Sequence, residues 1–86
     1  MFDWDDANID HIARHGLEPK DVEEALLDSE SVPMPAYNYG SEKRRGLVGA
    51  TNGGRILSVV YTERSGKTRP ITAREASKSE KRRYRR

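Results

Sequence analysis

The chain has 86 residues, 34% hydrophobic and 35% charged, which leaves room for one domain, residues 1–86, with a modest core. It contains no cysteine, no recognisable signal peptide and no apolar run near the roughly 20 residues of a membrane span, so we expect a soluble cytoplasmic protein that is neither a disulfide scaffold nor a thiolate zinc protein. Residues 1–30 carry a net charge of −8 and residues 31–86 a net charge of +10. This asymmetry favours a basic working surface, unless the two halves neutralise each other.

Two helices are predicted in the acidic part of the chain. Apolar side chains recur at i, i+3 and i+4 within residues 6–15 and again within residues 19–28. Asp6 is expected to cap the first helix, and Gly16 lies where a left-handed residue ends one. Pro19 suits the first position of the second helix.

The basic part of the chain has the period of strands. Two prolines limit residues 32–39 to an edge strand or a loop, and residues 44–51 form a plausible strand before an Asn-Gly-Gly turn. Residues 55–63 are apolar on both faces, which predicts a central strand. Residues 67–74 contain Pro70, which predicts an edge strand.

A capping box at residues 77–80 precedes a short basic helix over residues 81–86. The expected fold class is therefore α+β, with two N-terminal helices, a three- to four-stranded antiparallel sheet and a short C-terminal helix.

Metal and nucleotide chemistry find little support in the sequence. His11 and His15 share a helix face, but no third ligand is obvious, so no metal site and no cofactor are predicted. His15 can equally be a helix-ending residue that the dipole favours. No glycine-rich phosphate loop is present.

The basic half is the main candidate for function, because arginine binds phosphate through two hydrogen bonds and tyrosine can stack on an unpaired base. We expect it to contact single-stranded nucleic acid, particularly RNA. The predicted nucleic-acid-binding residues are Arg44, Arg55, Lys67, Arg69, Lys81, Arg82 and Arg83.

RNA cleavage needs only a base, a cation and an acid, so it can proceed without a metal. Glu63 and Arg64 end the central strand and could supply two of these groups. Simpler interpretations remain open: Glu63 and Arg64 could be a solvated pair, Arg74 could bind the acidic helices, and the basic end could be a solubilising tail.

Several segments together resemble the BrnT family, the ribonuclease half of a bacterial type II toxin–antitoxin pair. The start is similar to the family's Phe-Glu-Trp-Asp, the end of the first helix to Lys-His-Gly-Val, and a later segment to Ile-Ser-Ala-Arg-x-Ala. The matching segments are Phe2-Asp3-Trp4-Asp5, Arg14-His15-Gly16-Leu17, Glu42-Lys43-Arg44 with Gly49, residues 54–64, Ile71-Thr72-Ala73-Arg74-Glu75-Ala76, and Glu80 with Arg82 and Tyr84.

The resemblance implies a RelE-like fold, metal-independent RNA cleavage and growth inhibition. It also implies a ribbon-helix-helix antitoxin, with promoter DNA bound only through the toxin–antitoxin complex. By position it assigns catalysis to His15, Glu63, Arg64, Arg74 and Tyr84. Arginine hardly deprotonates, so Arg64 and Arg74 would stabilise phosphate charge, whereas His15 would transfer protons.

The chain departs from the family pattern at three places. Residues 18–29 lack the family's aromatic side chains, Arg45 replaces an aromatic residue, and Pro70 stands where a strand former is usual. The alternative function is therefore a divergent, non-catalytic module that binds RNA, DNA or a protein partner.

Overall fold

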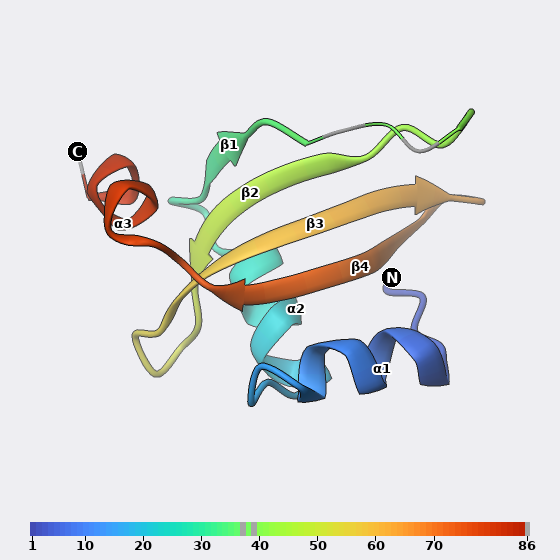
Figure 1. The fold of residues 1–86 in the computed structure, drawn as a ribbon, viewed down its shortest axis with the longest axis horizontal. Helices are drawn as coiled ribbons and strands as arrows, with labels where there is room; N and C mark the ends of the chain where they lie inside the picture. The colour runs from blue at the N-terminus through green and yellow to red at the C-terminus, as the bar shows by residue number, and fades with distance from the viewer. Residues whose placement is uncertain (37, 39, 86) are drawn as a thin grey trace.

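The computed structural model describes residues 1–36, 38 and 40–85, which form an α+β fold with three helices and one four-stranded antiparallel sheet (Figure 1). The expected fold class is confirmed. The elements in chain order are α1 (Asp6–Ala13), α2 (Pro19–Leu27), β1 (Val32–Met34), β2 (Arg45–Ala50), β3 (Ile56–Arg64), β4 (Lys67–Glu75) and α3 (Lys78–Tyr84).

The first helix is capped one residue earlier than the sequence analysis predicts. Asp5, not Asp6, has an extended backbone, and its side chain accepts a hydrogen bond of 2.8 Å from the amide of Asn8. Asp6 is already helical, so its side chain cannot fold back in this way. Gly16 has a positive φ of 72°, as expected for the residue that ends the helix.

The sheet has the order β1-β2-β3-β4, so β3 is an inner strand, and β1 and β4 are the edges, as the prolines indicated. Pro70 lies beside a β-bulge, where Val60 pairs with Thr72 and Tyr61 pairs with Pro70, leaving Ile71 without a partner across the ladder. A bulge on an edge strand accommodates a residue that has no amide hydrogen.

The amino-terminal segment runs along the outer side of β4. Phe2 forms a parallel bridge to Thr68, with hydrogen bonds of 2.8 Å from the Asp3 amide to the Thr68 carbonyl and 2.9 Å from the Thr68 amide to the Met1 carbonyl. Trp4 then packs against the core and donates a hydrogen bond of 2.8 Å to Glu23 in α2. These contacts fix the start of α1 beside β4.

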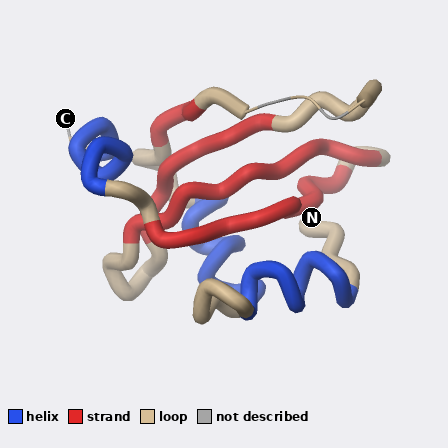
Figure 2. Tube along the Cα trace, in the orientation of Figure 1, coloured by secondary structure: helices blue, strands red, loops and turns tan. Residues whose placement is uncertain are grey.

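One face of the sheet is covered by α1 and α2 (Figure 2). The larger core lies there and contains Ile12, Leu17, Val22, Ala25, Leu47, Leu57, Val59 and Ala73. Gly49 lets α2 approach β2 closely, because a Cβ at this position would overlap the carbonyl oxygen of Ala25. We call this side of the sheet the helix face.

The opposite side, which carries Ser58, Val60 and Thr62 of β3, we call the open face. At one end of it, α3 packs through Tyr84 beside a small core of Val48, Ile56 and Ala76. Ser58 pairs with Val48 of this core, and the half-buried Val60 lies farther along β3. None of the described helices has the length and apolar character that a membrane crossing requires.

Candidate functional site

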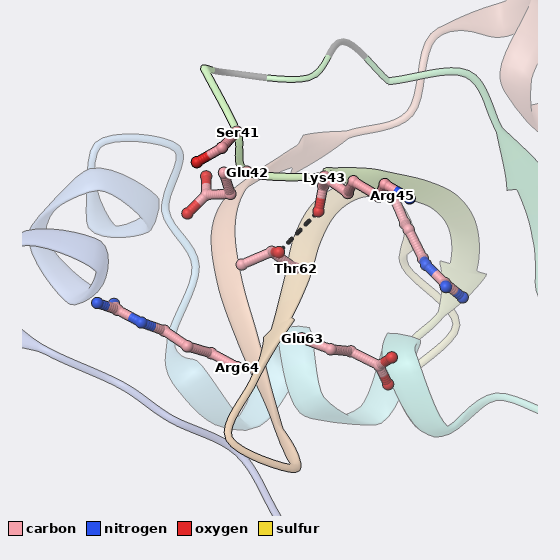
Figure 3. A pocket seen from close by; sticks show the side chains of 7 residues that line it. All are labelled: Ser41, Glu42, Lys43, Arg45, Thr62, Glu63 and Arg64. Carbon is pink, nitrogen blue, oxygen red and sulfur yellow. Dashed lines mark hydrogen bonds between the residues drawn. The ribbon is translucent and has the colours of Figure 1, made fainter.

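A charged hollow of about 500 Å³ lies where β3 ends and the chain enters β2 (Figure 3). It is built from the loop before β2 and from the last residues of β3. The lining residues are Ser41, Glu42, Lys43, Arg45, Thr62, Glu63 and Arg64.

A buried threonine fixes the shape of this hollow. Thr62 is 4% exposed, and its hydroxyl donates a hydrogen bond of 2.7 Å to the carbonyl of Lys43. The contact ties the loop across the end of β3, while the pairing of Arg45 with Tyr61 sets the register of the two strands. The charged side chains therefore project from a backbone that is held in place.

Glu63 and Arg64 leave the strand in opposite directions (Figure 3), since successive side chains of a strand alternate between faces. Arg45 pairs with Tyr61, two residues before Glu63, so Arg45 and Glu63 belong to the helix face. Arg64 belongs to the open face. The hollow therefore wraps around the end of β3 and presents charge on both sides of it.

Most of these side chains are free to bind a ligand. In the part of the chain that the structure describes, the side chains of Arg45, Glu63 and Arg64 make no hydrogen bond or ion pair, and all three are exposed. Glu42 differs, because its carboxylate forms an ion pair with the guanidinium of Arg44, at 2.9 Å. The hollow thus combines a free carboxylate, which can accept a proton, with cations that can stabilise phosphate charge.

Arg74 lies far from this hollow, although the sequence analysis groups it with Arg64. Arg74 pairs with Ser58, and Arg64 lies six residues farther along β3, which separates the two Cα atoms by about 20 Å at the usual strand rise. Both belong to the open face. The two arginines therefore cannot bind the same phosphate group.

Glu80 of α3 holds the Arg74 guanidinium. Its two carboxylate oxygens accept hydrogen bonds of 2.8 Å from Nη1 and 3.0 Å from Nη2 of Arg74. This contact, with hydrogen bonds from Ser77, lowers the pKa of Glu80 to about 2 despite the opposing effect of burial. The same pairing raises the pKa of Arg74, so both groups are charged at neutral pH.

Tyr84 is also engaged with another residue. Its hydroxyl donates a hydrogen bond of 2.6 Å to Asp28 at the end of α2, which raises the pKa of Tyr84 to about 12. Burial acts to raise the pKa of Asp28, but hydrogen bonds from Tyr84 and from the amides of Ala50 and Glu30 hold it below its usual range. Tyr84 thus joins α3 to α2 and β2.

His15 follows the last turn of α1, on the helix face. Asn8, near the start of this helix, donates a hydrogen bond of 3.5 Å to the carbonyl of Ile71, and α1 runs from there toward the far end of β4 (Figure 1). His15 is exposed, and its ring centroid is 6.3 Å from that of His11. Among the predicted catalytic residues, the hollow brings together only Glu63 and Arg64.

The predicted nucleic-acid-binding residues are dispersed. Arg69 lies against the amino-terminal segment and forms ion pairs with Asp3, at 3.5 Å, and with Asp5, which raise its pKa. Lys81 forms an ion pair of 3.1 Å with Glu75. The rest are Lys67 beside Arg64, Arg44 paired with Glu42, Arg55 in the turn before β3, and Arg82 and Arg83 exposed on α3.

The sequence alone does not show that Lys43, Arg45 and Glu42 line one hollow, or that Glu80 is the partner of Arg74. The run of charged residues before β2 was a signal, but the contact of this loop with Thr62 at the end of β3 is what brings them into one site. Among the described residues, no group of three or more histidines and carboxylates could hold a metal ion.

Comparisons with known proteins agree on the family. The family model for the BrnT ribonuclease toxin of type II toxin–antitoxin systems matches residues 4–80. The crystal structure of the Brucella abortus ribonuclease toxin BrnT superposes with a TM-score of 0.65 and 25% identity, covering 91% of this chain and 99% of that one. No curated protein sequence matches. The chain belongs to the BrnT family of ribonuclease toxins of type II toxin–antitoxin systems.

Proposed function

We propose that this ribonuclease toxin cleaves RNA without a metal ion, at the charged hollow around the end of β3. Membership of the family already implies an RNA substrate and an antitoxin partner. The observation that carries the proposal is the free carboxylate of Glu63 in one hollow with Lys43, Arg45 and Arg64. These groups supply a base and several cations, which is what transfer of a phosphoryl group to the neighbouring 2′-hydroxyl requires.

In this mechanism Glu63 takes the proton of the 2′-hydroxyl, and the 2′-oxygen attacks the adjacent phosphorus. The bond from phosphorus to the 5′-oxygen breaks, leaving a 2′,3′-cyclic phosphate and a 5′-hydroxyl. Arg45, on the same face as Glu63, stabilises the extra charge on the phosphate, and the ammonium group of Lys43 protonates the leaving oxygen. Arg64 binds the next phosphate on the open face.

Of the other predicted catalytic residues, none lines the hollow. His15 lies at the end of α1, Arg74 of β4 pairs with Ser58 near the other end of β3, and the Tyr84 hydroxyl donates a hydrogen bond to Asp28. We therefore assign proton transfer to Glu63 rather than to His15.

The test is cleavage of a defined single-stranded RNA with and without EDTA. The wild type, Glu63→Gln, Arg45→Ala and Arg64→Ala are compared with Arg14→Ala, which removes an exposed arginine from the end of α1. Glu63→Gln should lose about a hundredfold or more in rate, as expected for loss of a general base. The wild type and Arg14→Ala should cleave the RNA at the same rate, and EDTA should not change that rate. Both should leave products with 2′,3′-cyclic phosphate ends.

Full activity of Glu63→Gln would refute the site, and loss of wild-type activity in EDTA would refute metal independence. Binding of RNA that remains intact would instead support the non-catalytic alternative.

We further propose that the antitoxin is a ribbon-helix-helix protein, that the pair meets in the cytoplasm, and that promoter DNA is bound only by the complex. The support is the resemblance of the chain to its family across residues 4–80. Co-expression with a short reading frame adjacent to this gene should give a stable complex that shifts promoter DNA. A shift by the toxin alone would contradict this proposal.

A further inference from the structure

We propose that Arg74, held in place by Glu80, forms a second phosphate-binding subsite that grips the RNA chain several nucleotides away from the cleaved bond. The inference rests on the proposed function, because it takes the hollow around the end of β3 as the place of cleavage. It assigns Arg74 to substrate binding and Glu80 to the positioning of Arg74.

The geometry of the guanidinium supports this assignment. Nη1 donates to Glu80 and to the carbonyl of Glu75, at 2.8 Å and 3.2 Å, and Nη2 donates once to Glu80, at 3.0 Å. A guanidinium has five N–H groups, so Nε–H and the second Nη2–H remain. Within the described part of the chain these two have no partner. They point the same way and form a second fork, which matches two oxygens of a phosphate.

Glu80 is itself held firmly. Its side chain is only 13% exposed, whereas that of Arg74 is 49% exposed. The amide of Ser77 donates a hydrogen bond of 2.8 Å to the same carboxylate, and the Ser77 hydroxyl accepts a hydrogen bond of 3.3 Å from the Glu80 amide. Because its partner is anchored at the start of α3, the Arg74 guanidinium is oriented before any ligand arrives.

The position of the pair fits an extended RNA chain. Arg64 and Arg74 belong to the same face of the sheet, about 20 Å apart, with β3 between them. Lys78, Arg82 and Arg83 on α3 are exposed beside the Arg74 end. A chain bound at Arg64 and continuing over the open face therefore reaches Arg74 and the positive charge of α3.

Binding of uncleavable, fluorescently labelled 2′-O-methyl RNA tests the subsite apart from catalysis. A trinucleotide and a dodecanucleotide are compared by fluorescence anisotropy. Arg74→Ala should weaken dodecanucleotide binding by about tenfold and lower the slope of log affinity against log salt by about 1. Arg74→Lys, which keeps the charge but loses the fork, should weaken it by about threefold. Neither variant should change trinucleotide binding, and Arg14→Ala should bind both RNAs like the wild type.

Glu80→Gln separates positioning from charge. Removing a negative charge should by itself tighten RNA binding, whereas loss of the orienting carboxylate should weaken dodecanucleotide binding. We expect a weakening of about threefold in this variant, with the far-ultraviolet spectrum of the fold retained. Tighter binding by Glu80→Gln would overturn the positioning role.

Two other outcomes would overturn the subsite. If Arg74→Ala binds the dodecanucleotide as tightly as the wild type, there is no subsite at Arg74. If the variant loses the same factor in affinity for both RNAs, Arg74 belongs to the cleavage centre. If the wild type binds but never cleaves unmodified RNA, the proposed cleavage fails, and the binding of 2′-O-methyl RNA still decides the subsite.

Discussion

Asp28 is expected to contribute a large share of the stability of this small fold. One carboxylate oxygen accepts hydrogen bonds of 2.6 Å from the Tyr84 hydroxyl and 2.8 Å from the Ala50 amide. The other oxygen accepts a hydrogen bond of 2.9 Å from the Glu30 amide. The side chain therefore joins the end of α2 to β2 and to α3. Asp28→Ala removes all three contacts and leaves the Ala50 amide without an acceptor.

Hydrogen bonds to charged groups each contribute about 1.5–3 kcal/mol. Asp28 is half-buried, so we take the lower end, discount it for solvent, and expect a loss of about 2–3 kcal/mol in the free energy of unfolding. For a domain of this size 1 kcal/mol corresponds to about 4–8 °C, so the melting temperature should fall by about 10 °C or more. Tyr84→Phe, which removes one of the three bonds, should cost about 1 kcal/mol.

Urea unfolding followed by circular dichroism measures these losses, with Asp10→Ala, on the exposed side of α1, as the control. A double-mutant cycle of Asp28→Ala and Tyr84→Phe should show coupling, because the two side chains share a hydrogen bond. A cost below about 1 kcal/mol for Asp28→Ala, or strict additivity in the cycle, would refute the reasoning.

Three further predictions concern the fold and its pH dependence. The pKa of Glu80 is lowered from 4.5 to about 2, so its contribution to stability is complete above pH 4.5 and is lost as the pH falls toward 2. The free energies of unfolding in urea of the wild type and Glu80→Gln should therefore converge over this pH range. A difference that stays constant would contradict the pairing of Glu80 with Arg74. Gly49→Ala should cost about 2 kcal/mol or more, because the new Cβ overlaps a backbone oxygen in α2, whereas Gly53→Ala, whose Cβ would meet only Thr51 at 3.8 Å, should unfold in urea nearly like the wild type. Asp5→Ala should lower the melting temperature more than Asp6→Ala, because Asp5 both caps α1 and forms an ion pair with Arg69, and Asp6 does neither; a larger decrease in Asp6→Ala would contradict this placement of the cap.

The periodicity of the chain predicts most of the fold. Apolar residues on both faces of residues 55–63 predicted the inner strand, and Pro33 and Pro70 predicted the two edges. The capping box at Ser77 was readable because its residues are three apart. The cap of α1 was placed one residue late, since Asp5 and Asp6 differ only in backbone conformation, which sequence does not reveal.

The candidate site was less accessible, because its contacts join residues that are distant in the chain. The bond between Tyr84 and Asp28 spans 56 positions, and the loop reaches the end of β3 through Thr62 and Lys43, 19 positions apart. Charge alone could not distinguish Arg69, which is paired with Asp3 and Asp5, from arginines that stay free.

The sequence leaves open whether the acidic residues 1–30 neutralise the basic residues 31–86. Among the described residues, few ion pairs do so. The ion pairs of Arg69 are the only ones there that join the two parts. Most of the positive charge therefore remains available to an anionic ligand.

The edges of the sheet restrict how other chains can join this molecule. At one edge β1 has only three residues and contains Pro33, which has no amide hydrogen to offer. At the other edge the amino-terminal segment already bonds to Thr68, Pro70 lacks an amide hydrogen, and Asn8 occupies the carbonyl of Ile71. Growth of the sheet by intermolecular strand addition is thus disfavoured, which limits fibrous self-association and directs a protein inhibitor toward side-chain contacts on the faces instead.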